Sequence, residues 1–204
     1  MNTLRFTKVR RVKSPTRSHD GDAGLDFYLP TDLTRDDLAK ANIDSKYITF
    51  NYIGYSTIGT IGIYENISTG FIERIVLGPH TRILIPSGLR ILLTPSNSML
   101  MAANKSGIST KKGLIYTAEI VDSNYTGEVH IGLVNTTDYS ISIDISPNSK
   151  GLQFIHVPIF LTNPVEISNK DYDIISKDWG SRGSDGFGST DIPVENYITQ
   201  PDQD

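Results

Sequence analysis

Short segments in which apolar and polar residues alternate recur along the chain, and Gly, Pro, Asn or Ser separates them. The clearest of these segments are residues 4–12, 81–86, 89–94, 128–135, 140–145 and 152–160. A period of two residues is typical of strands with one buried face. Because such strands follow one another at short spacing, the pattern predicts an all-β sandwich or barrel, not alternating β and α units. We expect very little helix.

Three segments add detail to this picture. Residues 83–88 and 89–93 predict two strands around a Pro-Ser-Gly turn. Thr34, followed three residues later by Asp37, has the spacing of a capping box and predicts the start of a helix. The chain from 47 to 64 is rich in Tyr, Ile, Thr and Gly and predicts one or two hairpins. This region contains no evident catalytic or binding motif, so we interpret it as an elaboration on the core.

Residues 119–129 contain the most informative pattern. An apolar run ends on Asp122, a turn with Gly127 follows, and a second apolar run begins, which predicts a β-hairpin with Tyr125 at its tip. The backbone of such a hairpin can recognise the edge of a flat ring while Tyr125 covers a sugar or ring face. A carboxylate beside a bound ligand is a candidate general base. Asp and Asn also stabilise turns without any ligand, so this stretch alone leaves both interpretations open.

Residues 102–109 combine a cation, a hydroxyl and a glycine. Lys105 supplies charge, Ser106 a donor, and the backbone near Gly107 can approach an anion closely. This pattern indicates a phosphate-binding loop, but it is also common in surface loops that bind nothing.

Residues 182–190 form a glycine-rich segment near the C-terminus. Arg182 and the closing Ser189–Thr190 pair suit a polyphosphate, and Phe187 can stack on a base. Glycine-rich tails are often disordered, whereas an aromatic residue inside one favours a lid that closes over a ligand.

Two titratable residues lie in apolar surroundings. Asp26 falls within the small and apolar segment 23–27, where a buried acid is costly unless it is hydrogen-bonded or near a cation. A turn or capping role is the alternative. His156 lies in the apolar strand that begins near residue 150. A lone histidine there is more often a satisfied core or interface residue than a catalyst.

Composition narrows the class of protein. The 204 residues suffice for one domain with a core, and the absence of cysteine excludes a disulfide framework, a thiolate metal site and a cysteine nucleophile. A formal net charge of −4 disfavours a general nucleic-acid binder. No apolar run is long enough to span a membrane, and the N-terminus lacks the apolar core of a signal peptide. We therefore expect a cytoplasmic protein (in the host cytoplasm if viral or from a phage), with no direct nucleic-acid partner and no membrane.

In this order, the segments resemble the five motifs of the homotrimeric all-β dUTPases, the deoxyuridine triphosphate nucleotidohydrolases. The corresponding residues are 23–27, 104–109, 119–127, 151–156 and 182–190. The third and fifth motifs are specific, and the first and second support them. Residues 1–30 and 76–190 fit the family frame, and residues 33–73 resemble an insertion between the first and second motifs.

The resemblance implies a distorted jelly-roll β-barrel that assembles as a homotrimer. Residues 1–180 would form the single barrel domain, including the insertion, and residues 181–204 a flexible C-terminal tail. Each of three active sites would draw motifs from more than one subunit. The tail of one subunit would close as a lid over a site formed with its neighbours.

The implied reaction is hydrolysis of dUTP to dUMP and pyrophosphate, with Mg²⁺ on the triphosphate, which keeps uracil out of DNA and supplies dUMP for dTMP synthesis. By this resemblance Asp122 activates the attacking water, and Asp26 helps to hold hydrated Mg²⁺ through water. Tyr125 would pack on the deoxyribose and exclude a 2′-hydroxyl. The implied substrate-binding residues are Lys105, Ser106, Gly107, Tyr116, Ile120, Val121, Tyr125, His156, Arg182, Phe187, Gly188, Ser189 and Thr190.

The chain also departs from the family pattern. The departures are Lys105 in place of Arg, Tyr116 in place of Asn or a small residue, Glu119 in place of Gly, and Leu152, Gln153 and His156 where the fourth motif usually carries Asp-Arg and a later Gln. The substitution at Lys105 keeps the charge but loses the bidentate fork of an arginine.

There are two alternatives to the dUTPase interpretation. A dCTP deaminase shares the fold but resembles this chain less, because that family uses a glutamate where Gly132 stands and lacks the Asp122–Tyr125 arrangement. A non-catalytic nucleotide sensor or protein-binding module is the second, with residues 35–73 as the surface for a protein partner. Asp122 and the complete fifth motif favour the enzyme. We expect deletion of residues 35–73 to leave hydrolysis intact.

Overall fold

The structure, a computed structural model, describes residues 3–42, 49–51 and 60–178. The chain divides into two compact units, residues 1–161 and 162–204. The elements of the first unit are β1 (Thr3–Lys8), β2 (Leu25–Tyr28), α1 (Arg35–Ala41), β3 (Thr49–Asn51), β4 (Thr60–Glu65), β5 (Ile72–Leu77), β6 (Arg82–Thr94), β7 (Ser98–Ala103), α2 (Ser106–Lys112), β8 (Leu114–Tyr116), β9 (Ile120–Asp122), β10 (Glu128–Asn135), β11 (Ile141–Asp144) and β12 (Lys150–Pro158). The all-β prediction is confirmed.

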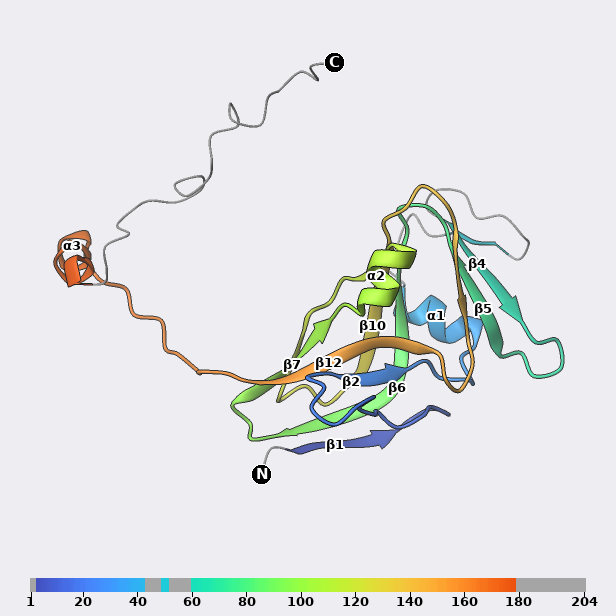
Figure 1. The fold of residues 1–204 in the computed structure, drawn as a ribbon, viewed down its shortest axis with the longest axis horizontal. Coiled ribbons are helices and arrows are strands. Elements are labelled where there is room, and N and C mark those ends of the chain that lie inside the picture. The colour runs from blue at the N-terminus through green and yellow to red at the C-terminus, as the bar shows by residue number, and fades with distance from the viewer. Residues whose placement is uncertain (1–2, 43–48, 52–59, 179–204) are drawn as a thin grey trace, which may run out of the picture. The chain divides into compact units, whose positions relative to one another are not determined.

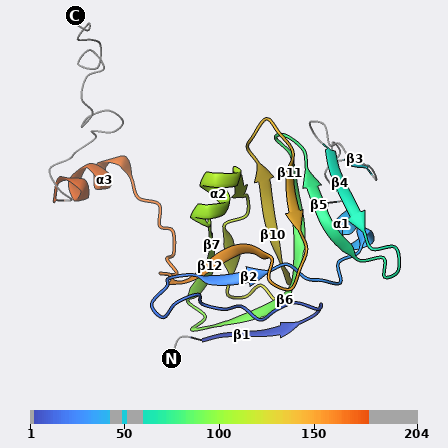
Figure 2. The ribbon, with the colours of Figure 1, turned by 45° about the vertical axis from the view of Figure 1, so that its right-hand side comes forward.

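The described strands form three four-stranded sheets (Figures 1 and 2). Their strand orders are β1-β6-β10-β8, β11-β5-β4-β3 and β2-β12-β7-β9. The sheets share one apolar core, in which Phe27 of β2 and Phe154 of β12 meet edge to face with ring centroids 4.6 Å apart. Alternating burial along β10 and β7 follows from the alternating sequence, since successive side chains point to opposite faces.

The segment at residues 82–94 is one strand, β6, and not the predicted pair of strands around a turn. Its first part pairs with β10 and its last part with β1. Gly88 lies near this change of partner with φ of +75°. A Cβ there would lie 3.0 Å from side-chain atoms of Arg10 and Val12. The glycine therefore bends a continuous strand beneath the N-terminal segment instead of reversing the chain.

The predicted capping box at the start of α1 is confirmed. The backbone N–H of Asp37 donates to the Thr34 hydroxyl at 3.3 Å, and the Thr34 N–H donates to the Asp37 carboxylate at 2.9 Å. Leu38 on the inner face of this helix is fully buried. The Asn42 side chain donates to the Leu84 carbonyl at 2.8 Å and accepts from the Leu84 N–H at 2.9 Å. Both views place α1 beside the β5 side of the barrel.

The described part of residues 33–73 contributes side chains to the common core. Leu38, Ile61, Ile63 and Ile72 are buried in the common core. β4 pairs with β5, which also pairs with β11 of the barrel. β3 runs parallel to β4, so these two strands do not form a hairpin. Residues 43–48 and 52–59, which hold the predicted hairpin turns in part, lie outside the described residues.

The second unit begins at Thr162, earlier than the expected tail boundary at residue 181. It contains α3 (Asn169–Ile175) and the 3₁₀ helix η1 (Ser176–Asp178). Ser168 caps α3 by accepting from the Asp171 N–H at 3.1 Å. Five of the predicted site residues lie outside the described residues: Arg182, Phe187, Gly188, Ser189 and Thr190. Across the described part of the chain, no helix is long and apolar enough to span a membrane.

Candidate functional site

Asp26 of β2 lies at the centre of a charged cluster whose members are distant in sequence. Its side chain is buried, and Oδ1 and Oδ2 each lie 2.5 Å from an ammonium group, that of Lys105 and that of Lys150 respectively. Oδ2 also accepts a hydrogen bond from Ser18 at 2.9 Å. The sequence argument that a buried acid here needs a cation is therefore correct, and the structure supplies two.

Burial by itself would raise the pKa of Asp26, because a low-dielectric environment disfavours the charged form. Hydrogen bonds from Lys105, Lys150 and Ser18 outweigh burial and hold the pKa of Asp26 below its usual value. The hydrogen bond to Asp26 raises the pKa of Lys150. At neutral pH the cluster is therefore fully ionised, with one negative and two positive charges.

The sheet β2-β12-β7 brings this cluster together. Gln153 of β12 stands in register with Asp26 on one side and Ala103 on the other. Its side-chain amide donates to the Asn104 carbonyl at 3.1 Å. A Cβ on Gly24 would lie 2.8 Å from the Gln153 side-chain oxygen, so the glycine leaves room for this side chain. Gln153 thus packs between the first and second motifs.

Lys105 is the N-cap of α2, and Ser106 and Gly107 form its first turn. The predicted loop is therefore the start of a short helix. A Cβ on Gly107 would meet no atom within 4 Å, so packing within the protomer does not require a glycine at this position. The open space leaves the backbone of this turn accessible to a ligand or to a neighbouring subunit. Asn104 connects the turn to β8 by accepting from the Tyr116 N–H at 3.2 Å.

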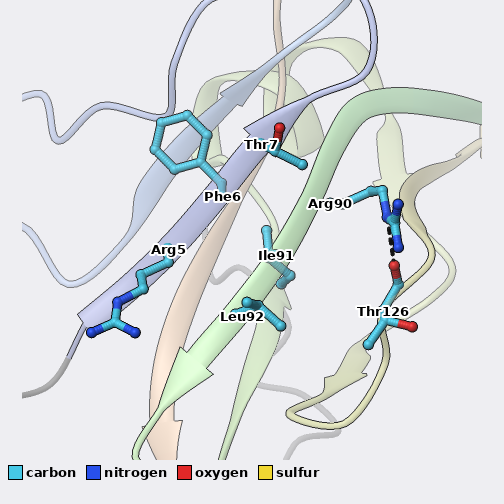
Figure 3. Close-up of a pocket in the computed structure, with 7 residues that line it drawn as sticks. All are labelled: Arg5, Phe6, Thr7, Arg90, Ile91, Leu92 and Thr126. Carbon is cyan, nitrogen blue, oxygen red and sulfur yellow. Dashed lines mark hydrogen bonds between the residues drawn. The ribbon is translucent and has the colours of Figure 1, made fainter.

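Asp122 and Tyr125 lie at a corner between two sheets, and the predicted hairpin is wrong. β9 pairs with β7, whereas β10 pairs with β6 and β8. Beside a pocket between β1 and β6, Arg90 donates to the Thr126 carbonyl at 2.7 Å and ties the corner to β6 (Figure 3). The Tyr125 hydroxyl donates to the Glu128 carbonyl at 2.9 Å. The ring of Tyr125 remains 43% exposed at the surface.

A single protomer does not bring Asp122 and Lys105 together. Asp122 is in register with Met99 of β7, and Lys105 follows Ala103 at the other end of that strand. Four residues of strand separate these two levels by about 13 Å. Within one subunit, Asp122 and Lys105 therefore lie at opposite ends of β7.

The remaining predicted residues are spread over the same sheet and its neighbour. Ile120 is exposed and Val121 half-buried on β9, and Tyr116 is half-buried on β8. His156 Nε2 lies 2.8 Å from the Ser98 hydroxyl, three residues beyond Gln153 on β12. Its role in substrate binding stays a prediction.

Lys150 is the member of the cluster that sequence reasoning missed. It precedes the segment assigned to the fourth motif, and β12 shifts register against β2 between Lys150 and Leu152. This bulge redirects the lysine relative to a regular strand. A cation at the start of the strand was the available signal, but simple alternation does not predict the direction in which it points.

A family model described as dUTPase matches residues 71–190, which is more than half of the chain. The chain belongs to the dUTPase family. The deoxyuridine 5′-triphosphate nucleotidohydrolase of Bartonella quintana is 34% identical over 140 residues, covering 67% of this chain and 74% of that protein. The protein of the same name from Buchnera aphidicola is 28% identical over 145 residues, covering 70% and 87%.

Solved structures of the dUTPase family share the fold. A mutant dUTPase of Staphylococcus bacteriophage 80alpha with dUpNHpp has a TM-score of 0.62 at 18% identity, covering 94% of this chain and 100% of that one. A mutant dUTPase of S. aureus phage phi11, solved with a structural Mg(II) ion, has a TM-score of 0.53 at 17% identity, covering 82% and 97%. The confirmed resemblance agrees with the all-β barrel described above.

Gly132 bears on the deaminase alternative to a dUTPase. A Cβ at this position of β10 would lie 2.4 Å from the Thr117 hydroxyl and 3.3 Å from Leu84. A side chain here would have to displace the Thr117 hydroxyl, and the glycine carries no carboxylate for a deaminase, so this position favours the dUTPase interpretation.

The ion pairs of Asp26 predict a pH-dependent contribution to stability. Because folding depresses its pKa below the unfolded value of 3.8, this contribution is present above that value and disappears as pH falls through the folded pKa. We expect Asp26→Asn to lower the free energy of unfolding by about 2 kcal/mol at neutral pH and by progressively less as the pH falls below 3.8. Thermal unfolding between pH 2.5 and 7 measures the difference.

The matched control is Asp144→Asn, which removes an exposed ion pair with Arg74. It is expected to change stability by less than about 1 kcal/mol at any pH. An Asp26→Asn variant whose loss of stability is the same at pH 2.5 and pH 7 would contradict the ionic account.

Proposed function

We propose that this protein hydrolyses dUTP to dUMP and pyrophosphate in a Mg²⁺-dependent reaction, as a homotrimer. The contrast between its two site carboxylates carries the proposal. Asp26 is buried and bound to two lysines, whereas Asp122 is exposed, and among the described residues no side chain pairs with its carboxylate. A base must be free to take a proton, so different surroundings give the two acids different roles.

In this proposal Asp122 takes a proton from a water molecule as the water oxygen attacks the α-phosphorus. The bond from that phosphorus to the bridging oxygen breaks, and pyrophosphate leaves. Tyr125 packs on the deoxyribose and leaves no room for a 2′-hydroxyl. Tyr116 and the backbone of Ile120 and Val121 line the uracil edge. His156 is proposed as a further contact with substrate.

The triphosphate binds at the cluster of Asp26, Lys105 and Lys150 in one subunit, and a neighbouring subunit supplies Asp122. Lys105 and Lys150 outnumber Asp26 in charge, so the cluster carries a net positive charge that attracts phosphate. The Ser106 hydroxyl and the open backbone at Gly107 add donors. Arg182, Ser189 and Thr190 bind the outer phosphates, and Phe187 stacks on uracil with Gly188 beside it, as the tail closes over the substrate.

The donor set fits Mg²⁺ that arrives with the nucleotide. Among the described residues, no group of three or more His, Asp or Glu side chains is placed to hold a metal ion. Mg²⁺ is commonly held by substrate phosphates, water and one or two carboxylates. Lys105, Lys150 and Ser18 occupy three acceptor positions of Asp26, which leaves about one for a water of the hydrated ion. When bound, Mg²⁺ would neutralise charge on the phosphates.

The separation of Asp122 from Lys105 supports the homotrimer. If one subunit contributes the phosphate cluster and another the Asp122 corner, the distance of about 13 Å along the sheet is no obstacle. A third subunit would contribute its tail. A protein partner bound through residues 35–73 and the cytoplasmic location remain predictions.

The test is pyrophosphate release from dUTP, dCTP, dTTP and UTP, each with Mg²⁺ and again with excess EDTA. We expect release from dUTP alone, and only with the metal ion. Ammonia released from dCTP would favour the deaminase instead. Binding of dUTP without release of pyrophosphate would favour a nucleotide sensor on this fold.

A further inference from the structure

Arg10 lies outside the proposed substrate site and joins two elements of the fold. Its Nε and Nη2 donate to the Glu128 carboxylate of β10 at 2.8 and 3.3 Å. Its Nη1 lies 2.9 Å from the Asp37 carboxylate of α1. All three side chains are only about one-fifth exposed. One guanidinium thus connects α1 to the first residue of β10.

Glu128 is held at both its side chain and its backbone. Oε1 accepts from the Gly88 N–H at 2.7 Å as well as from Arg10. Its backbone carbonyl accepts from the Tyr125 hydroxyl at 2.9 Å. The register of β10 against β6 shifts between Glu128 and His130. The same carbonyl lies 2.9 Å from His130 Nδ1, and because a bulge interrupts the regular ladder here, the side-chain anchor of Glu128 contributes to its orientation.

The charges of this network stay ionised at neutral pH. Burial alone would raise the pKa of Asp37, but hydrogen bonds from Thr34 and Arg10 outweigh burial and lower it. Burial opposes the charge on Arg10, and hydrogen bonds to Glu128 and Asp37 outweigh that effect and raise its pKa. Removing the guanidinium would leave the carboxyl groups of Asp37 and Glu128 without their shared partner.

We propose that Arg10 is a positioning residue, which holds Tyr125 through Glu128 and so sets how strictly the enzyme excludes a 2′-hydroxyl. This inference rests on the proposed function, since it requires Tyr125 to pack on the sugar. It also gives α1 a role in selectivity, because Asp37 orients the guanidinium that Glu128 depends on.

The contacts around Tyr125 make the position of its ring sensitive to the hydrogen bond with the Glu128 carbonyl. A Cβ on Gly127 would lie 2.5 Å from the Tyr125 hydroxyl, so the ring lies directly over the glycine. Arg90 fixes the Thr126 carbonyl independently of Arg10 (Figure 3). With the turn held by Arg90, loss of the Glu128 anchor shifts the ring of Tyr125 and leaves the rest of the corner in place.

The test compares kcat and KM for dUTP and UTP in the wild type and in Arg10→Lys. Lysine keeps the charge but lacks the fork that reaches two carboxylates at once. We expect the ratio of kcat/KM for dUTP to that for UTP to fall about tenfold, with KM for dUTP rising. Asp37→Asn, which spares the Glu128 pair, is expected to lower the ratio in the same direction but less.

The matched control is Arg74→Lys, an arginine in an exposed ion pair with Asp144 on the β5–β11 edge. It should leave the ratio unchanged. A purely structural Arg10 would lower the melting temperature and the amount of active enzyme, scaling both substrates equally. An unchanged ratio in Arg10→Lys and Asp37→Asn would therefore overturn the proposal.

Turnover of dUTP by the wild type is measured first and tests the proposed function alone. If the wild type binds dUTP without hydrolysing it, the ratio is taken from the dissociation constants of dUTP and UTP. A wild type that prefers dUTP and an Arg10→Lys variant that does not would then support the positioning role, although the enzymatic function had failed.

Discussion

Asp122→Asn is expected to lower kcat for dUTP by about 10³-fold and to leave binding of dUTP nearly unchanged. Asparagine has almost the same size as aspartate but cannot take a proton from water. The hydrogen bond from the Tyr125 N–H uses the backbone carbonyl of residue 122, at 3.1 Å, so the substitution keeps the corner intact. Single-turnover pyrophosphate release and a direct binding measurement separate the two effects.

Asp138→Asn is the matched control, because Asp138 is an exposed carboxylate paired only with His80 among the described residues. It should keep full activity. An Asp122→Asn variant with more than about one-tenth of the wild-type kcat would show that another group takes the proton. Asp26 could not replace it readily, since two lysines and Ser18 occupy its oxygens and lower its pKa, which makes it a weaker base.

Patterns among neighbouring residues were sufficient to predict individual helices and strands. The strand predicted at residues 128–135 is β10 with the same bounds, because its apolar positions face the core at a period of two. The capping box of Thr34 and Asp37 is formed by residues three apart, and it occurs as predicted. In both cases the residues that determine the structure are neighbours in the chain.

The wrong predictions mainly concern which strands pair, because the pairing partners are distant in the sequence. The pattern at residues 119–129 is equally compatible with a hairpin and with a corner between sheets, and the choice depends on β7, which lies about twenty residues earlier. The Pro-Ser-Gly sequence at 86–88 likewise has the composition of a turn. In the fold, Gly88 bends a strand whose partner changes from β10 to β1.

The candidate site shows the same division between local and distant information. The need of Asp26 for a cation followed from its apolar neighbours, and Lys105 was already a candidate for the phosphate. The second cation, Lys150, lies far along the chain and reaches Asp26 through a bulge that no local pattern predicts. The separation of Asp122 from Lys105 depends on how β9 and β12 align with β7, and this strand register follows from the three-dimensional structure alone.

Deletion of residues 35–73 is now expected to abolish folding, contrary to the expectation from sequence. The deletion removes Leu38, Ile61, Ile63 and Ile72, which are at most 3% exposed. Burial of each such side chain contributes about 1.5–3 kcal/mol, so the loss is about 6–12 kcal/mol. A typical domain has a total stability of about 5–15 kcal/mol. The variant should form aggregates with neither a cooperative unfolding transition nor hydrolysis.

Size-exclusion chromatography, thermal unfolding and pyrophosphate release check this expectation. The control shortens the turn at residues 67–69 between β4 and β5, where Ile67 is fully exposed, and should cost less than about 1 kcal/mol. If the large deletion instead remains folded and active, the segment is dispensable, and a partner could bind it without affecting catalysis. If only the short deletion is tolerated, the segment is part of the folded core, and a partner that binds α1 or β4 binds the barrel itself.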